Sequence, residues 1–507
     1  MEPVTISDLP MTQEELVAVA QGTPLVLGEP AKARIAASRA LLDEAMSSGD
    51  AIYGVSTSVG HGKDTRVPRE ELEQLQQFLV ASHGGAFGPL LDRTVVRAAM
   101  AVRVCGMARG GSGASPAAAD TLMAMLNAGV HPVLHSTGSV GAADISPMAG
   151  IAQVAVGTGT AEFRGEVLPG AEALLRAGIE PLRLQGRDGL ALISANGVSI
   201  GHGALVLARA ARTARAADQA VVLSIEATRG NPSGFSAPAA AAKPYPGQVA
   251  AAAHLHELLK GSQLLTRDGP RSVQDALSFR VVPQVHGAFR EFLATAGRAV
   301  DTELNSASDN PLIDVESGSV LSNGNFHPMV LAIAFDALRV ALVHVGQLSE
   351  RRMSHLWTAV MAAMKSGPPP GNRGPAAAPG MQLRYAGSAC YTELRLLAAP
   401  ATLDSTVLDV GVEDHATGAM LSVRTTEQAL CLLEDLLAIE VLPAADLLRV
   451  SPREHSVPGP RRFSGSPRRR RPAQDRPRTS TGICGNAFPE TRRTRPARGR
   501  GSPQVQR

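Results

Sequence analysis

The chain has 507 residues, of which 44% are hydrophobic and only 3% aromatic. This length is enough for roughly two to four ordinary domains or for one large helical body. Abundant alanine, leucine and valine beside scarce aromatic residues favour closely packed helices over a β-sandwich or barrel. The cysteines at 105, 390, 431 and 484 lack C-x-x-C spacing, which argues against a disulfide framework and against a zinc site.

The net charge of +3 conceals a basic C-terminal segment. Residues 451–507 contain 15 arginines, no lysine and three acidic residues, so the preceding 450 residues are net negative. This segment has almost no apolar residues, and we expect it to be disordered. Three interpretations remain open: an arginine-rich arm for nucleic acid, a solvated extension, or out-of-frame translation of a GC-rich gene. The abrupt change after Val450 favours the last, because an arginine tract without interleaved aromatic residues is a weak signal of nucleic-acid binding.

The first 66 residues predict short elements and a loop. Residues 1–50 are typical of short helices around a strand in TPLVLGEP (23–30). The acidic N-terminal stretch has no basic region ahead of an apolar core, so we expect no signal peptide and a cytoplasmic protein. In residues 51–66, Gly54, Gly60 and Gly62 lie between polar residues, which predicts a mobile loop.

Helical spacing dominates from Glu70 onward. One helix ends at the glycines 110–111, and the next starts with Ser115 as N-cap and Pro116 at its first position and stops near Gly129. The proline- and glycine-rich segment 365–380 predicts a loop. The pattern predicts a mainly α protein, a bundle of long helices. Further helices are predicted at 199–228, 248–262, 283–303, 326–364, 380–398 and 425–448.

Residues 326–348 form the most apolar long run of the chain. It carries Asp336, Arg339 and His344. Charged side chains within a membrane-spanning segment are costly, so the run is better interpreted as a buried helix of a soluble protein than as a membrane span.

Several stretches, in a fixed order from about residue 10 to 445, resemble the histidine/phenylalanine/tyrosine ammonia-lyase and aminomutase family. The resemblance rests on the order in which these stretches follow one another, and not on any single stretch. The clearest are YGVSTSVG (53–60) for YGINTGFG, TGSVGAADISPMAG (137–150) for GSVGASGDLAPLAH, QDALSFRVVPQVHGA (274–288) for QDxYSxRCxPQVxGA, ELNSASDNPLI (303–313) for EINSxTDNPL, SNGNFHP (322–328) for SGGNFHG, and VEDH (412–415) for QEDH.

The resemblance implies a long-helix bundle of the ammonia-lyase type and a homotetramer whose active sites are each assembled from three subunits. It also implies a small amino acid substrate. In the family, an Ala-Ser-Gly triad in the loop that corresponds to residues 137–150 cyclises into an electrophilic imidazolone, MIO. This group captures the amine or the ring of the substrate and makes ammonia a workable leaving group.

The triad itself is degenerate in this chain. After Gly141 the sequence reads Ala142-Ala143-Asp144, where the family has Ala-Ser-Gly-Asp, so one residue, the serine and the glycine are absent. Without the serine there is no hydroxyl to eliminate as water, and without the glycine the ring nitrogen belongs to a hindered residue. Ser139 matches the family's own preceding serine and does not replace it. We therefore expect that MIO does not form, and we expect no other cofactor and no metal.

Tyr53 matches the tyrosine that acts as the catalytic base of the family. An ordinary tyrosine has a pKa of about 10, so this role needs a nearby positive charge or hydrogen-bond donors. The alternative is a tyrosine packed beneath a loop. With Tyr53, the degenerate loop residues Ala142, Ala143 and Asp144 complete the predicted catalytic set.

The resemblance also implies a set of substrate-binding residues. Among them, Arg280 suits a substrate carboxylate, because a guanidinium makes paired, charge-assisted bonds. The alternatives are an inter-helix ion pair for Arg280, and structural roles for the others. Two positions depart from the family, with Leu277 in place of a tyrosine and Ser56 in place of an asparagine. The set comprises His83, Asn196, Gln274, Arg280, Asn310, Phe326 and Glu413, where Glu413 is the residue that favours an imidazole substrate.

Two functions follow from these observations. The first is a carbon–nitrogen lyase that eliminates ammonia, or a related leaving group, from an amino acid with Tyr53 as base and without MIO. The alternative is a catalytically silent homologue that serves as a ligand-binding or partner subunit. We expect an ammonia-lyase-like domain at 1–450, with both loops in 1–200 and the helical bundle in 200–450, followed by the tail at 451–507.

Overall fold

The computed structural model describes residues 2–266, 269–365, 381–403 and 406–450. The chain forms two units, Met1–Val457 and Pro458–Arg507, and all the described residues belong to the first. The tail interpretations, and the loop expected at 365–380 except for its first residue, lie outside the described residues. The expected division of the helical part near residue 200 stays a prediction.

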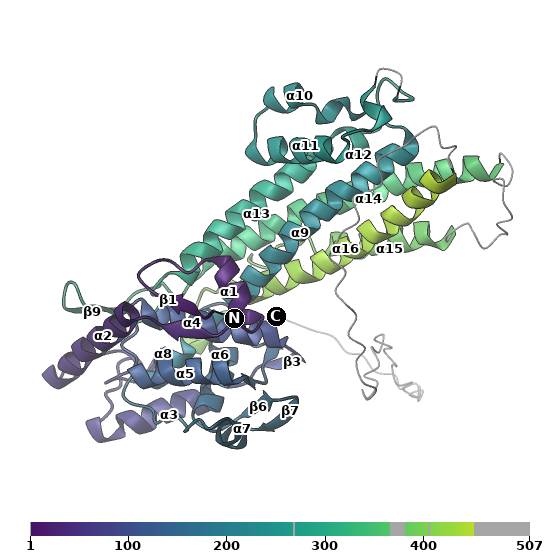
Figure 1. Cartoon of the computed structure of the whole chain (residues 1–507). Coiled ribbons are helices and arrows are strands. Elements are labelled where there is room, and N and C mark those ends of the chain that lie inside the picture. The colour runs from purple at the N-terminus through teal and green to yellow at the C-terminus, as the bar shows by residue number, and fades with distance from the viewer. Residues whose placement is uncertain (1, 267–268, 366–380, 404–405, 451–507) are drawn as a thin grey trace, which may run out of the picture. The chain divides into compact units, whose positions relative to one another are not determined.

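The described residues are predominantly helical, which confirms the mainly α class (Figure 1). Four long helices, α9, α13, α14 and α16, form the bundle, and shorter helices surround it. The helices are α1 (Gln13–Ala20), α2 (Glu29–Ser48), α3 (Leu72–Ser82), α4 (Arg93–Ala108), α5 (Pro116–Ala128), α6 (Ile145–Ala155), α7 (Gly170–Ala177), α8 (Asp188–Ile193), α9 (Gly197–Thr228), α10 (Ala237–Ala241), α11 (Pro246–Leu258), α12 (Leu277–Arg280), α13 (Val282–Leu304), α14 (Met329–Lys365), α15 (Met381–Leu396) and α16 (Ala419–Val450).

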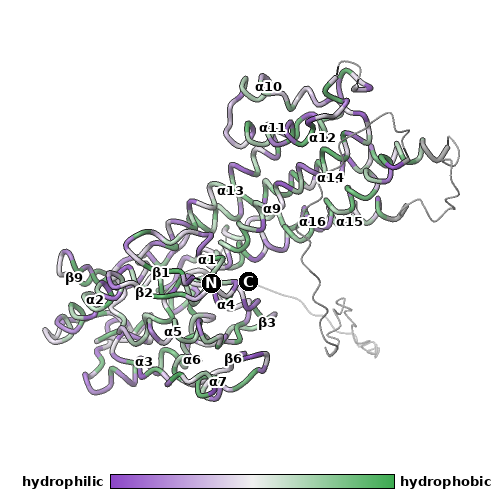
Figure 2. The backbone as a smooth tube through the Cα atoms, in the orientation of Figure 1, coloured by the Kyte–Doolittle hydropathy of each residue, from purple (hydrophilic) through white to green (hydrophobic). Residues whose placement is uncertain are grey.

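The long helices pack in neighbouring pairs. Helix α14 lies against both α16 and α13, and α9 lies against α16 and α4. Hydrophobic and hydrophilic residues alternate along them, as expected for helices that bury one stripe (Figure 2). A buried ion pair also links two of these helices. Arg352 of α14 and Glu440 of α16 are both fully buried and lie 2.6 Å apart.

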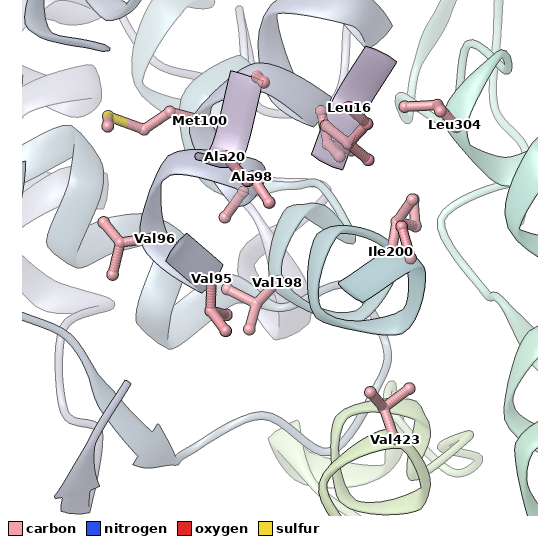
Figure 3. Close-up of a cluster of buried hydrophobic side chains, with 14 of the residues drawn as sticks. Leu16, Ala20, Val95, Val96, Ala98, Met100, Val198, Ile200, Leu304 and Val423 are labelled. Atoms are coloured by element: carbon pink, nitrogen blue, oxygen red, sulfur yellow. The ribbon is translucent and has the colours of Figure 1, made fainter. Parts of the chain in front are cut away.

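Glycines bring α9 unusually close to α4. A Cβ on Gly197 would lie 2.9 Å from the carbonyl oxygen of Ala99, and one on Gly201 would lie 2.8 Å from the Cβ of Ala98. Because neither glycine has a side chain, the first turns of α9 rest directly on α4. Figure 3 shows the core at this junction, built from side chains of α1, α4, α9, α13 and α16. This packing fixes the start of α9, where the candidate site lies.

In the described part of the chain, short strands pair in four small sheets beside the helices. Strands β1 and β2 pair in parallel, β3 pairs with β5, β6 lies between β4 and β7, and β8 pairs with β9. The strand predicted in residues 23–30 is confirmed as β2, but the other strands were not foreseen. Helix α2, with 20 residues, is not the short helix that was expected. The strands are β1 (Val4–Ile6), β2 (Leu25–Leu27), β3 (Phe87–Leu90), β4 (Val130–Pro132), β5 (His135–Thr137), β6 (Thr160–Phe163), β7 (Glu166–Pro169), β8 (Leu312–Asp314) and β9 (Ser319–Leu321).

The predicted helix limits agree with the structure where capping residues mark them. The Ser115 hydroxyl accepts the N–H of Ala118, Pro116 is the first residue of α5, and Gly129 ends that helix in the left-handed conformation. Two segments, Asp188–Thr228 and Met329–Ala362, are long and apolar enough to cross a membrane, but 94% and 67% of their most apolar windows are buried inside the protein. Burial of this kind is typical of core helices.

Candidate active site

The degenerate triad loop is held by segments far away in the sequence. The Thr417 hydroxyl donates to the carbonyl of Gly141 at 2.8 Å. The N–H of Gly418 donates to the carbonyl of Val140 at 2.9 Å, and the N–H of Ala143 donates to the carbonyl of Phe326 at 3.2 Å. The loop is therefore clamped between the start of α16 and the segment before α14.

Asp144 anchors the loop to the start of α9. It precedes α6, yet its buried carboxylate accepts the N–H of Ser199 at 2.7 Å and the Ser199 hydroxyl at 2.9 Å. The Ser139 hydroxyl donates to the same carboxylate at 2.9 Å. Burial raises the pKa of Asp144, and these hydrogen bonds oppose that shift. The Ser139 hydroxyl is thus engaged by the Asp144 carboxylate, and the expectation that it does not replace the triad serine stays a prediction.

The residues at the centre of the loop carry no reactive group. Ala142 and Ala143 are buried and end in methyl groups. Ala143 has a φ of 61°, the left-handed conformation that glycine adopts most easily. Its N–H bonds to Phe326, and the N–H of Asp144 bonds to the carbonyl of Ala195 at 2.9 Å. Both backbone nitrogens therefore serve as hydrogen-bond donors in the fold.

Asn196 lies next to this loop. Its side-chain N–H donates to the Phe326 carbonyl at 2.9 Å, so it shares this acceptor with Ala143. Its Oδ1 is buried without a hydrogen-bond partner among the described residues, which is unusual for a buried polar atom. Beside Phe326, the His327 and His415 rings share a hydrogen bond of 2.8 Å. Asn196 and the backbone of Phe326 thus lie beside the triad loop, and their roles toward a substrate stay predictions.

Tyr53 lies in acidic surroundings. Its phenolic oxygen accepts the N–H of Gly60 at 3.0 Å. Burial raises the pKa of Tyr53, Glu413 and Asp409 raise it further, and only the Gly60 hydrogen bond and the Arg187 charge lower it. A single chain therefore provides one hydrogen-bond donor and one cation that lower the pKa of Tyr53. Burial and the two carboxylates outweigh them, so the pKa is raised.

Glu413 and His83 lie on the same side of the site. Burial and the charge of Asp409 raise the pKa of Glu413, and the charge of His83 lowers it. The His83 Nδ1 bonds to the carbonyl of Leu79 at 2.8 Å. Because a carbonyl only accepts, Nδ1 supplies the hydrogen of this bond, and Nε2 is the ring nitrogen left to face a ligand.

Sequence reasoning missed Arg187, which holds Asn310 in place. The guanidinium is fully buried and donates to the carbonyls of Asn310 and Pro311 at 3.1 and 3.2 Å. It also lies 3.6 Å from the carboxylate of Asp309. Burial lowers the pKa of Arg187 to about 10. No motif marked this arginine, and its burial and its contacts more than 120 residues away are visible only in the structure.

Gln274 and Arg280 lie far from Tyr53 in the same chain. Asn231, just after the end of α9, donates to the carbonyl of Val273 at 2.7 Å, whereas Asn196 caps the start of α9. Helix α9 has 32 residues and is therefore about 48 Å long. Gln274 and Arg280 therefore lie near the opposite end of α9 from Asn196 and the triad loop.

Arg280 and its neighbour Leu277 are exposed on α12. Leu277, at the position of the family tyrosine, is 58% exposed. Within the described part of the chain, the Arg280 guanidinium has neither an ion-pair nor a hydrogen-bond partner, so the inter-helix ion pair is not observed there. The described residues also include no cluster of three or more His, Cys, Asp and Glu side chains that could hold a metal ion.

Known proteins resemble this chain over most of its length. A sequence model of the aromatic amino acid lyase family matches residues 11–467. The histidine ammonia-lyase of Gloeobacter violaceus is 39% identical over 86% of this chain and 85% of its own length. That of Caldanaerobacter subterraneus is 36% identical over 88% of both chains.

Solved structures agree with these relatives. Phenylalanine aminomutase from Pantoea agglomerans superposes with a TM-score of 0.82 at 28% identity, over 89% of this chain and 91% of that one. Histidine ammonia-lyase from Trypanosoma cruzi gives a TM-score of 0.77 at 29% identity, over 89% and 85%. The fold class and the resemblance are confirmed, and the chain belongs to the aromatic amino acid lyase family, a family of carbon–nitrogen lyases.

Proposed function

We propose that this chain is a cytoplasmic lyase that eliminates ammonia from an amino acid, with histidine as the first candidate substrate. The names of its relatives support the reaction class. The observation that carries the proposal is the grouping of Tyr53 with Glu413 and Asp409, each of which raises the pKa of the phenol. An acidic site of this kind attracts a ligand that carries a positive charge, as the α-ammonium group of an amino acid does.

The bound ammonium would also prepare Tyr53 for its role. A cation beside Glu413 and Asp409 offsets their field and lowers the pKa of the phenol. The phenolate of Tyr53 then removes a β-proton, the two electrons of that C–H bond form the Cα=Cβ double bond, and the C–N bond breaks. The α-ammonium leaves as ammonia, which takes the proton from Tyr53 to become ammonium. The products are an unsaturated acid and ammonium.

The loop residues do not fit the MIO group. Ala143 has no hydroxyl to lose as water, and only two residues separate Gly141 from Asp144, where the family has three. The N–H of Asp144, which would have to attack a carbonyl, donates instead to Ala195. We therefore derive no step through this group. The mass of the peptide that spans residues 137–150 tests the point, because cyclisation would make it lighter by the water that is lost.

The missing electrophile limits the substrates that can react well. Elimination of ammonia from histidine has to overcome a weakly acidic β-hydrogen and a poor leaving group. A related amino acid with a more acidic β-hydrogen or a better leaving group would react faster at the same site. The substrate panel should therefore include such compounds beside histidine.

We further propose that Arg280 and Gln274 reach the site from another copy of the chain, in a homotetramer. The distance between α12 and Tyr53 within one chain supports this assembly. A second support is an apolar stripe on α14, where Val330, Ile333 and Val340 are exposed, Val330 by 70%. Their spacing of three and seven residues places them on one helix face, as in helices that pack against a partner.

A catalytically silent homologue is the second candidate, and the degenerate loop favours it. The hydrogen bonds of Asp144, Thr417 and Gly418 would then preserve the shape of a site whose chemistry has been lost. Such a chain would bind a ligand or act as a partner subunit in a mixed assembly.

The deciding experiment measures ammonia release and formation of the conjugated acid from the substrate panel. Tyr53→Phe is compared with the full chain, and Tyr245→Phe is the control, because Tyr245 is exposed at the start of α11. Release that is lost only with Tyr53→Phe supports the lyase. Absence of release from every substrate, by a chain shown to be folded and assembled, favours the silent homologue.

A further inference from the structure

Asp409 joins the loop of Tyr53 to the hairpin of Glu413. Its Oδ2 accepts the backbone N–H of His61 at 2.9 Å. Its Oδ1 lies 2.7 Å from Nδ1 of the His61 ring. Since a carboxylate only accepts, Nδ1 supplies the hydrogen of the second bond. Both oxygens of one carboxylate are therefore engaged by one residue of the Tyr53 loop.

The turn beneath this contact is shaped to receive the carboxylate. Gly60 begins the short helix η1 (Gly60–Gly62) with a φ of 59°. A Cβ on Gly60 would lie 2.0 Å from Oδ2 of Asp409, so only glycine leaves room for the contact. The N–H of this same glycine donates to the hydroxyl of Tyr53. The position of Asp409 is thus transmitted to the phenol through two adjacent residues, His61 and Gly60.

The hairpin on the other side is strained. Asp409 and Val410, in η6 (Asp409–Gly411), have φ values of 46° and 55°, a left-handed conformation that is costly for a β-branched valine. The hairpin is closed by the N–H of Leu408, which donates to the carbonyl of Glu413 at 2.8 Å. Strain of this kind persists where the surrounding contacts require one geometry, and it clusters at functional sites.

From this geometry we infer that Asp409 is a positioning residue, which fixes the Tyr53 hydroxyl relative to Glu413 by holding Gly60 and His61. We call the Asp409–His61 contact the clasp. Its catalytic consequence rests on the proposed function, but its existence does not. An exposed ion pair alone adds little stability. The clasp differs from such a pair because one of its two hydrogen bonds comes from the backbone N–H of His61. In addition, the carboxylate fills the space that a side chain at Gly60 would occupy.

Hydrogen–deuterium exchange of the full chain tests the clasp directly. We expect Asp409→Ala to speed exchange at residues 60–61 by about tenfold or more, since a hydrogen bond to a charged group is lost. Asp409→Asn, which retains one acceptor oxygen, should have a smaller effect. His61→Ala, which retains the backbone bond, should also fall below Asp409→Ala. Asp64→Ala is the control, because Asp64 is an exposed carboxylate of the same loop that pairs only with Lys63 in the described structure.

Turnover tests the positioning role. If the clasp orients the base, Asp409→Ala lowers kcat by about tenfold with little change in KM, and Asp409→Asn recovers part of the loss. Exchange no faster than in Asp64→Ala would overturn the clasp. Faster exchange with an unchanged kcat would overturn the positioning role. If the unmodified chain releases no ammonia, the exchange result still decides the clasp, and that failure belongs to the proposed function.

Discussion

The carboxylate of Asp144 accepts both the backbone N–H and the hydroxyl of Ser199, at 2.7 and 2.9 Å. Asp144 lies directly before α6, and Ser199 lies in the first turn of α9, so this contact joins the starts of two helices. A carboxylate at a helix start is favoured by the unpaired N–H groups and the positive end of the helix dipole. The loop therefore keeps an intact anchor, although only Ala142 and Ala143 stand between Gly141 and Asp144.

Replacing this anchor should destabilise the protein. Asp144→Asn turns one acceptor into a donor that faces the donors of Ser199 and Ser139, and buried donors are left unpaired. We expect the free energy of unfolding to fall by about 2 kcal/mol, the cost of an unsatisfied buried group. Asp92→Asn is the control, because Asp92 caps α4 at the surface and asparagine caps a helix about as well. Equal losses in urea unfolding would contradict the buried anchor.

The backbone at Ala143 predicts a second stability effect. Its φ of 61° costs an alanine roughly 1–2 kcal/mol relative to a right-handed conformation, whereas glycine adopts it freely. Ala143→Gly should therefore leave stability unchanged or raise it by up to about 1 kcal/mol. Ala142→Gly is the matched control, because Ala142 is buried without a positive φ and should lose stability. A loss of the same size in both variants would show that the loop strain is absent.

Local sequence signals predicted the helices well but not the contacts between distant segments. Ser115, Pro116 and Gly129 mark the ends of α5 because caps and turns are decided by neighbouring residues. Strand β3 was missed because it exists only through pairing with β5, where Phe87 lies opposite Thr137. A fully exposed strand that contains a proline has no periodicity to reveal it.

The residues of the candidate site also fall into those predicted from local motifs and those found only through long-range contacts. Tyr53, Glu413 and Asn196 were proposed from motifs that lie within single short stretches. The clasp of His61 and Asp409 joins residues 348 positions apart, and no role was predicted for either residue, although each lies close to a motif. Long-range partners of this kind follow from the packing of the hairpin on the Tyr53 loop, which no local periodicity encodes.

The acidic surroundings of Tyr53 predict a pH effect. As a base Tyr53 must lose its proton, so kcat/KM should rise with pH into the alkaline range, because burial and the two carboxylates raise its pKa. Removing the charge of Glu413 lowers that pKa, so Glu413→Gln should move the rise to lower pH. Glu316→Gln, at an exposed turn, is the control. A pH profile that does not move with Glu413→Gln would exclude Tyr53 as the titrating group.

Mixing two inactive variants tests whether the site is shared between chains. If Arg280 comes from another copy, a mixed assembly of Tyr53→Phe and Arg280→Ala chains contains some sites with both native residues, and a fraction of the ammonia release returns. Tyr53→Phe mixed with His83→Ala is the control. Within one chain Glu413 raises the pKa of Tyr53 and His83 lowers the pKa of Glu413, so Tyr53 and His83 belong to the same site and every mixed site would keep one defect.

Each variant alone, assembled with itself, sets the baseline for this measurement. Co-expression is preferable to mixing of finished assemblies, because subunits that are held together by apolar faces exchange slowly. Recovery in the first pair and not in the control would support a site built from several chains. Recovery in neither pair, from assemblies shown to be mixed, would mean that Arg280 acts within its own chain or not at all, and that its exposure on α12 has another purpose.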